Sequence, residues 1–203
     1  MPSPADHPTE APRAEARRTQ IRNAAADCFR QYGFHGTSIA QISKAAGMST
    51  GHIYHYFENK EAIIADIVAQ DMERHQTMIV ELRAASDVKA AMIERAVEAV
   101  EANLDPGKAG LHLEIVAEAA RNPHIAEIVR ATDLRFRKSL GETLRILRQA
   151  GGHDDSEAAI SGMVEALAAM FEGLRIRAIR NPDIDHDAVV RIFRRMVHEL
   201  LTH

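Results

Sequence analysis

The stretch FHGTSIAQISKAAGMSTGHIYHYFENKE, from Phe34 to Glu61, constrains the fold more than any other part of the chain. Ser38 followed by Gln41 fits the capping box that begins a helix. Gly47 stands where the end of that helix favours a left-handed residue, the conformation that glycine adopts at least cost. The pattern predicts a short helix that ends in a tight glycine turn.

A second short helix is predicted directly after the turn. Ser49 can cap it, and residues 50–56 form its body. Ile53 and Phe57 lie four residues apart on the face that we expect to point into a core. Asn59 can cap a longer helix after it. Two short helices joined by a glycine turn are the pattern of a helix-turn-helix, whose second helix can enter the DNA major groove.

The segment from about Arg17 to Ile67 resembles the DNA-binding domain of the TetR (tetracycline repressor) family of bacterial transcription regulators. The turn glycine, the second helix and a Y-x-x-F-x-x-K ending occur together at fixed spacing. The matching residues are Phe29, Gly33, Gly36, Thr37, Ile42, Ala45, Gly47, Gly51, Ile53, Tyr54, Tyr56, Phe57, Lys60 and Glu61. The resemblance implies an N-terminal three-helix domain that binds a palindromic operator in double-stranded DNA, and a C-terminal helical domain for ligand binding and dimerisation.

Composition agrees with an all-α fold. Ala, Leu, Ile, Arg and Glu dominate the 203 residues, and β-branched runs are few. The single cysteine excludes an internal disulfide framework and suits a reducing cytoplasm, which is the expected location. No apolar run approaches the roughly 20 residues of a membrane span, and the N-terminus lacks an apolar signal core. We therefore expect no membrane association.

Charge divides the chain into two parts. Residues 13–60 carry seven Lys or Arg and three acidic residues, although the whole chain has a net charge of −4. Residues 61–203 carry 18 basic and 24 acidic residues. A basic segment attached to an acidic body is typical of a DNA-binding domain whose remainder has another task.

We expect three regions and about nine helices. The regions are a disordered N-terminal arm over residues 1–12, the helix-turn-helix domain over 13–58, and the helical effector-binding and dimerisation domain over 59–203. The predicted helices cover about 13–32, 39–46, 50–56, 60–84, 88–103, 110–121, 123–150, 155–180 and 185–201. Asp105-Pro106-Gly107 is predicted to be a turn.

The resemblance implies a role for each exposed residue of the helix-turn-helix. Base edges are expected to meet Thr50, Gly51, His52 and His55. Phosphate contacts are expected from Tyr54, Tyr56 and Lys60, with Thr37, Ser38 and Ser49 near the starts of the two short helices. As an alternative, Tyr54 and Tyr56 only pack the small domain. Arg17 and Arg18 either reach a minor groove or form a solvated helix start.

Two motifs favour a structural reading. His52 and His55 form an H-x-x-H pair that helical spacing could bring to one metal ion, but no cysteine or carboxylate stands at ligand spacing beside them. Cys28 occupies the predicted buried face of the first helix, where a small apolar residue is favoured over a redox sensor. We expect no metal and no cofactor.

By analogy with the family, the helices between residues 60 and 180 enclose a cavity for a small-molecule effector. The candidate lining residues are Met92, His112, Ile115, Glu118, Phe136, Leu140, Met163, Met170 and Phe171. Methionines adapt to varied apolar ligands, and a buried Glu118 or His112 favours a cation or a hydrogen-bonding group. As an alternative, these residues are plain core and Glu118 is an exposed partner of Arg121 or Arg130.

The two C-terminal helices carry broad apolar faces, and the resemblance implies that they pair with those of a second subunit as a homodimer. The expected interface residues are Ile160, Val164, Leu167, Phe193, Met196 and Leu200. A single helix-turn-helix reads only half of a palindromic site, which also favours a dimer. As an alternative, both apolar faces pack within one chain.

No catalytic motif appears: the chain has no G-x-S-x-G, P-loop, H-E-x-x-H or glycine-rich dinucleotide turn. We therefore expect a ligand-responsive DNA-binding regulator, most simply a repressor, and no enzyme. The alternative is a helical small-molecule carrier or enzyme with a vestigial helix-turn-helix. The basic and well-capped 34–61 segment favours the regulator.

Overall fold

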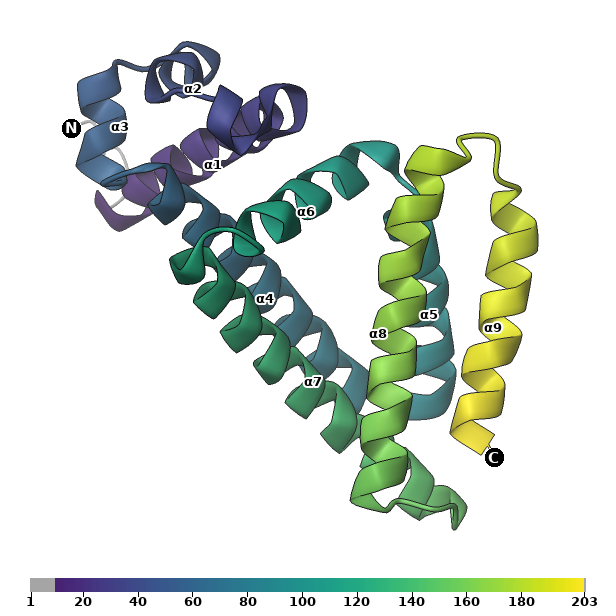
Figure 1. The fold of residues 1–203 in the computed structure, drawn as a ribbon. Coiled ribbons are helices and arrows are strands. Elements are labelled where there is room, and N and C mark those ends of the chain that lie inside the picture. The colour runs from purple at the N-terminus through teal and green to yellow at the C-terminus, as the bar shows by residue number, and fades with distance from the viewer. Residues whose placement is uncertain (1–9, 203) are drawn as a thin grey trace, which may run out of the picture. The chain divides into compact units, whose positions relative to one another are not determined.

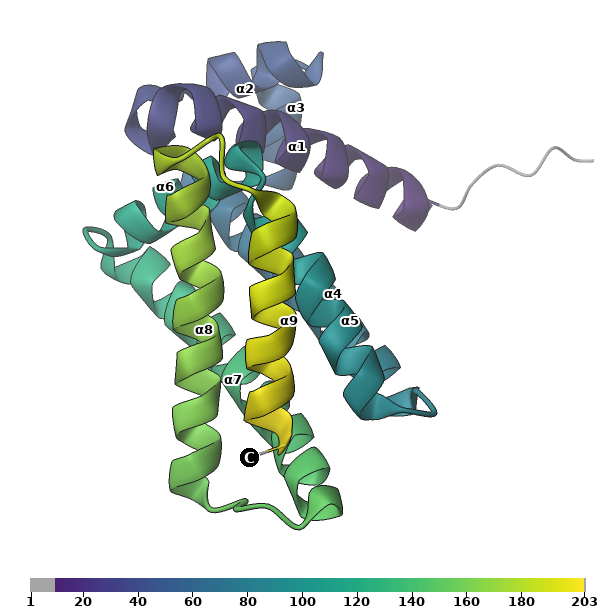
Figure 2. The same ribbon diagram turned by 90° about the vertical axis from the view of Figure 1, so that its right-hand side faces the viewer.

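The computed structural model describes residues 10–202, and within that range the chain forms nine α-helices and no strand (Figures 1 and 2). The all-α prediction is confirmed. The helices are α1 (Glu10–Gly36), α2 (Ile39–Ala46), α3 (Thr50–Tyr56), α4 (Lys60–Ala84), α5 (Val88–Asn103), α6 (Pro106–Ala119), α7 (Pro123–Gly151), α8 (Glu157–Arg180) and α9 (His186–Thr202). They divide into an N-terminal unit that ends at Ile67 and a C-terminal unit that begins at Val68.

The N-terminal unit is built on the turns that the sequence predicts. The Ser38 hydroxyl accepts from the Gln41 backbone N–H at 3.2 Å, and the Ser38 N–H donates to the Gln41 side chain at 2.7 Å, which completes the capping box. Gly47 ends α2 in the left-handed conformation at φ 64°. α1 keeps helical geometry up to Gly33, where φ reaches 72°. The chain then bends toward α2.

A compact apolar core holds α1 and the two short helices α2 and α3 together. Its fully buried members come from α1, α2, α3 and the first turns of α4: Ile21, Ala25, Phe29, Phe34, Ile42, Ile53, Ile63 and Ile64. Cys28 belongs to this core, and burial raises the pKa of its thiol, so the reactive thiolate is disfavoured. Tyr32, one helical turn after Cys28, would continue the buried face of α1, but it is 49% exposed because it stands just before the bend at Gly33.

Several boundaries differ from the sequence-based expectation, and three of them affect how the domains are built. α1 begins at Glu10, inside the range expected for the arm, and residues 1–9 of that range lie outside the described residues. α6 begins at Pro106, so the predicted turn is a helix start: Asp105 caps it, and proline is tolerated in the first turn. The two units divide after Ile67, because the first turns of α4 complete the N-terminal core.

In the C-terminal unit, α8 and α9 run antiparallel, side by side, as both views show, and α5 packs against both of them (Figures 1 and 2). One core cluster unites four of its helices with the end of α4: Leu82, Met92, Ala96, Leu144, Ile160, Met163, Val164, Leu167, Val197 and Leu201. A smaller cluster lies around Val100, Leu104 and Leu174. Within the described range, no helix is long and apolar enough to cross a membrane.

Candidate functional site

α3 turns one narrow face inward and leaves the rest of its surface to solvent. Ile53 is fully buried and Phe57, directly after the helix, is 3% exposed, so these two side chains fix α3 to the core. The Ser49 hydroxyl caps the helix by accepting from the His52 N–H at 3.2 Å. The exposed residues are Thr50, Gly51, His52, Tyr54 and His55. A groove-entering helix needs this arrangement, with several polar side chains on its outer face.

Aromatic contacts order the histidines of α3. The Tyr56 ring centroid lies 5.4 Å from that of His52 and 5.0 Å from that of His55, and Tyr56 is half-buried. Tyr54 is 57% exposed, so packing of the small domain does not account for it. Among the described residues, no group of three or more His, Cys, Asp or Glu side chains is placed to hold a metal ion.

Lys60, which the sequence predicts to contact a phosphate, is half-buried and held within the N-terminal unit. Its ammonium group donates to the carbonyl oxygens of Phe34 and Thr37, both at 2.7 Å, and lies 4.5 Å from the centroid of the Phe34 ring. These contacts link the start of α4 to the segment between α1 and α2. Lys60 therefore positions the helix-turn-helix, and its charge is directed at the protein backbone.

Thr37 is also a structural residue. It is 2% exposed, and its hydroxyl lies 2.8 Å from the carbonyl of Gly33 and 3.1 Å from that of Cys28. A buried hydroxyl cannot reach a phosphate, so its predicted DNA contact is withdrawn. Ser38 and Ser49 are exposed at the starts of α2 and α3, with their hydroxyls in the helix caps.

An ion-pair network that the sequence analysis missed joins α1 to α4 within the N-terminal unit. Asp66 accepts from Arg18 at 2.5 Å and from Arg22 at 2.7 Å. Arg18 also stacks 4.5 Å over Phe57, so it is not a merely solvated helix start, and its contact with a minor groove stays a prediction. Two signals in the sequence could have indicated the network. Asp66 is the one acid inside the apolar run IIADIV, and Arg18 and Arg22 lie one helical turn apart in α1.

The C-terminal unit holds a polar cluster around Arg175 of α8. Arg175 Nε donates to the Asn103 side-chain oxygen, and Nη1 donates to His112 Nε2, both at 2.5 Å. Because a guanidinium has no acceptor, His112 must accept through Nε2 and carry its proton on Nδ1. His75 lies near Arg175, and its ring centroid is 5.2 Å from that of Phe136. We call these five residues the Arg175 cluster.

Burial sets the charge of the cluster. Burial, with a smaller contribution from nearby Arg175, lowers the pKa of His112 to about 4, so His112 is neutral at pH 7. Burial also lowers the pKa values of His75 and of Arg175 itself. Arg175 and His112 are nevertheless only half-buried, and His75 keeps an exposed side chain. The cluster is therefore a polar site that solvent reaches, and it carries one positive charge.

The other predicted effector residues lie elsewhere. Met92, Ile115 and Met163 are buried, and Leu140 and Phe171 pack against the core. Glu118 is 2% exposed at the α6–α7 corner, where it accepts from Asn122 at 3.1 Å and has Arg121 at 3.9 Å. Met170 faces α9. Of the nine candidates, only His112 and Phe136 belong to the Arg175 cluster. The other three members of the cluster, Asn103, Arg175 and His75, are not among the candidates from the sequence.

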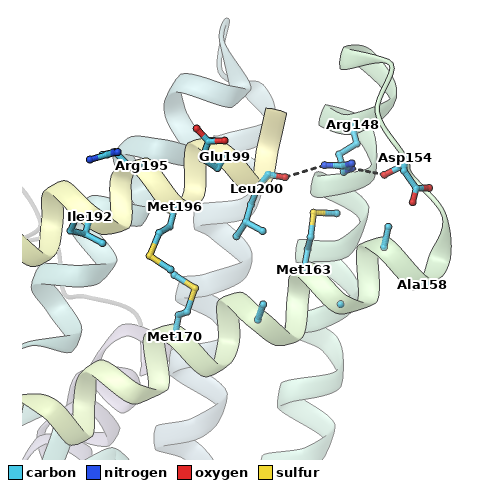
Figure 3. Close-up of a pocket in the computed structure, with 13 residues that line it drawn as sticks. Arg148, Asp154, Ala158, Met163, Met170, Ile192, Arg195, Met196, Glu199 and Leu200 are labelled. Atoms are coloured by element: carbon cyan, nitrogen blue, oxygen red, sulfur yellow. Dashed lines mark hydrogen bonds between the residues drawn. The ribbon is translucent and has the colours of Figure 1, made fainter. Parts of the chain in front are cut away.

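A long open groove of about 1140 Å³ runs between α8 and α9. Figure 3 shows Met170 of α8 and Met196 of α9 pointing toward each other, with Arg148 bonded to the carbonyls of Leu200 and Asp154 at one end. Small residues form its α8 wall: Ala158, Ala159, Gly162 and Ala166. Ile192 and Met196 are 51% and 41% exposed. We call this surface the α8–α9 groove.

The predicted dimer residues fall into two groups. Ile160, Val164 and Leu167 are 3–4% exposed in the core of their own chain, so their assignment to an exposed interface is wrong. α8 has two apolar faces, and periodicity does not tell which one faces inward. Phe193 packs on Phe171 with ring centroids 5.6 Å apart. Met196 and Leu200 do line the α8–α9 groove.

Comparison with known protein families accounts for both units. Residues 21–67 match the model of bacterial regulatory proteins of the tetR family. Residues 91–202, more than half of the chain, match the model of the C-terminal part of BetI-type transcriptional repressors. The first match covers the helix-turn-helix, and the second covers most of the C-terminal unit, from residue 91 onward.

Individual proteins agree with the family models. The HTH-type transcriptional regulator UidR of Escherichia coli K12 is 33% identical over 138 residues, which cover 68% of this chain and 69% of UidR. Salmonella enterica GusR has a similar structure, with a TM-score of 0.75, 29% identity, and coverage of 93% of this chain and 96% of that one. Bacillus subtilis FadR, solved with stearoyl-CoA, shares the fold with a TM-score of 0.74 at 18% identity, over 88% of this chain and 96% of its own. By these matches, which agree with the exposed and well-capped α3, this chain belongs to the TetR family of bacterial transcriptional regulators.

Proposed function

We propose that this protein is a homodimeric repressor that binds a palindromic operator through α3 and is released by a small organic effector. The observation that carries the proposal is α3 itself. Ile53 and Phe57 anchor it, and its remaining surface, with His52 and His55 ordered against Tyr56, stays open to solvent. We place its activity in the cytoplasm, where bacterial DNA is found.

The DNA-reading role is tested by selection on randomised duplexes at fixed salt. His52→Ala removes a side chain expected at a base edge, so it should cost about 1–3 kcal/mol and relax the preference at one position of each half-site. Tyr54→Phe removes only a hydroxyl expected at a phosphate. It should weaken binding evenly across sequences and leave the selected motif unchanged.

The two variants serve as controls for each other. Equal losses across all sequences for both would show that His52 does not read bases. If the wild-type protein selects no duplex motif, the regulator reading of α3 fails and the vestigial helix-turn-helix alternative is favoured.

The dimer is supported by the α8–α9 groove. Small residues line its α8 wall, and two exposed apolar side chains, Ile192 and Met196, line it from α9. Small residues let a second helix approach closely, and exposed apolar side chains gain free energy when a partner covers them. A second copy is the occupant that fits, because the operator we propose has two half-sites.

Effector control follows from differential affinity. The dimer is expected to have one arrangement in which the two α3 helices match the operator and another in which their spacing is wrong. An effector that binds more tightly to the second arrangement lowers the affinity for DNA, typically by about 1–3 kcal/mol. α4 is the covalent link, since one uninterrupted helix from Lys60 to Ala84 belongs to both units. A screen of metabolites for displacement of a labelled operator duplex tests this part. If no compound changes DNA affinity, effector control is refuted.

A further inference from the structure

Arg175 differs in the kind of partner that it has from three arginines on neighbouring helices of the C-terminal unit. Arg83 is paired with Glu142 at 3.2 Å, Arg137 with Glu165 at 2.7 Å, and Arg145 with Glu157 at 2.5 Å. The hydrogen bonds of Arg175 instead go to an amide oxygen and an imidazole nitrogen, both neutral.

The nearest acids do not supply the missing counter-charge. Glu172 and Asp71 raise the pKa of Arg175 through longer-range attraction, and this effect is smaller than the lowering by burial. Among the described residues, no carboxylate forms an ion pair with it within 4.0 Å. A partly buried cation without a close anion is costly, and binding an anion would reduce that cost.

The geometry of the guanidinium leaves a free edge. Arginine has five N–H donors in a planar fork, and the two bonds to Asn103 and His112 use Nε and one hydrogen of Nη1. The second Nη1 hydrogen and both Nη2 hydrogens remain. One hydrogen from each of these nitrogens can meet the two oxygens of a carboxylate in a bidentate pair.

The surroundings fit an organic molecule that bears the anion. The Arg175 cluster draws one residue from each of α4 to α8: His75, Asn103, His112, Phe136 and Arg175. His75 lies near enough to Arg175 for the two charges to interact, and the Phe136 ring beside His75 offers an apolar face. His75 keeps accessible surface, so a ligand can reach the cluster.

We propose that Arg175, held by Asn103 and His112, is the recognition point for a carboxylate group of the effector, so that the effector is an organic carboxylic acid with an apolar body. This inference rests on the effector control proposed above and names the chemical class. The single negative charge of a carboxylate matches the single positive charge of the Arg175 guanidinium, since the two histidines of the cluster are neutral. A phosphate dianion would bring a second negative charge toward Glu172 and Asp71.

The experiment measures ligand-induced thermal stabilisation and operator displacement on the full-length protein. The probes are benzoate, hippurate, octanoate and 4-phenylbutanoate, each beside its methyl ester, with octyl phosphate as the dianion and octylamine and choline as cations. We expect at least one acid to stabilise the wild type while its ester does not. Arg175→Met should weaken that acid at least about tenfold, since it removes a charge-assisted bidentate contact.

Two further variants make the comparison specific. Arg177→Met, two residues along α8 with an exposed side chain, should leave the affinity for the acid unchanged. Arg175→Lys keeps the charge without the fork and should recover only part of the affinity. If Arg175→Met does not fold, Arg175→Lys and the acid–ester comparison in the wild type decide.

The failures are distinguishable. If acids and esters bind equally, or Arg175→Met binds the acid as tightly as the wild type, the carboxylate site is refuted. It is also refuted if only neutral, cationic or dianionic probes displace the operator, and effector control then stands. If no probe of any charge binds or displaces the operator, the carboxylate site fails with effector control.

Discussion

At Lys60, one ammonium group serves two backbone carbonyls and one aromatic face. Lys60→Met keeps much of the side chain's volume but removes both hydrogen bonds. The half-buried carbonyls of Phe34 and Thr37 then lose a charged donor, and the free energy of unfolding should fall by about 1–3 kcal/mol. Urea denaturation measures the change.

Lys44 provides the control because it is an exposed lysine in the same unit. Lys44→Met should change stability by no more than about 0.5 kcal/mol. Unchanged stability in Lys60→Met, together with a salt dependence of DNA binding reduced by about one charge, would restore the phosphate contact that the sequence pattern suggested.

His112 makes the stability of the C-terminal unit depend on pH. Its pKa is about 4 in the folded protein and 6.5 at its ordinary value, so between these pH values the unfolded chain takes up a proton that the folded chain does not. The contribution of His112 is therefore complete above about pH 6.5 and is lost as the pH falls toward 4. Melting temperatures measured from pH 7.5 to 4.5 should show this decline.

His112→Gln isolates the effect, since glutamine can accept from Arg175 without titrating. The variant should lose less stability on acidification than the wild type over the same range. His75, whose pKa is also lowered, and the nearby Asp71 are present in both proteins and cancel in the difference. Parallel pH curves for the two proteins would contradict the assignment.

At the scale of elements, α1 depends on one glycine to end its long straight segment. Gly33 has φ 72° and ψ 167°, a region that is essentially restricted to glycine. Gly33→Ala should destabilise the protein by about 1–3 kcal/mol. Gly110→Ala is the matched control: it is helical with open space at the Cβ position and should be neutral or stabilise by up to about 1 kcal/mol. Equal effects would contradict the strain argument.

Local chemistry made most of the elements predictable. α3, α4 and α5 have the expected bounds, because Ser49, Asn59 and Asp87 are side-chain caps that act over three residues. The start of α6 was missed because Asp-Pro-Gly suits both a turn and a capped helix start, and only the packing of Ala109 and Ile115 decides. The inward face of α8 could not be predicted either, because two of its faces are apolar. Only the packing of the folded chain shows that Ile160, Val164 and Leu167 point into the core.

The site was predictable where it is contiguous in the sequence. The exposed residues of α3 lie within six positions, so one helix places them all. His112 and Asn103 stand 63 and 72 residues before Arg175 in the chain. A single arginine or asparagine in a helix does not reveal so distant a partner. The charge of Lys60 suggested DNA, and no local pattern shows that the fold also brings two carbonyls to it.

At the scale of the whole molecule, Gly162 offers a direct test of the homodimer. A Cβ atom added there meets no neighbouring side chain or other helix within 4 Å, and it would project from the wall of the α8–α9 groove. Gly162→Trp should leave the protomer folded and convert a species of twice 22.4 kDa into one of 22.4 kDa in sedimentation. Ser161→Trp, exposed and outside the groove lining, is the control and should remain dimeric.

Loss of the dimer should also abolish tight binding to a duplex with two half-sites and leave weak binding to one half-site. A Gly162→Trp protein that stays dimeric would place the subunit contact elsewhere. A wild-type monomer that binds the palindrome tightly would refute the dimer altogether.

The Asp66 network also decides how such regulators can be recombined by engineering. A chimera joined at residue 59 would transplant Arg18 and Arg22 without the carboxylate that receives them, and would leave two guanidiniums against a foreign helix. A junction after Ile67 carries donor and acceptor together, with Ile63 and Ile64. The transferable cassette for exchanging operator specificity is therefore the chain through Ile67, two helical turns longer than the helix-turn-helix alone.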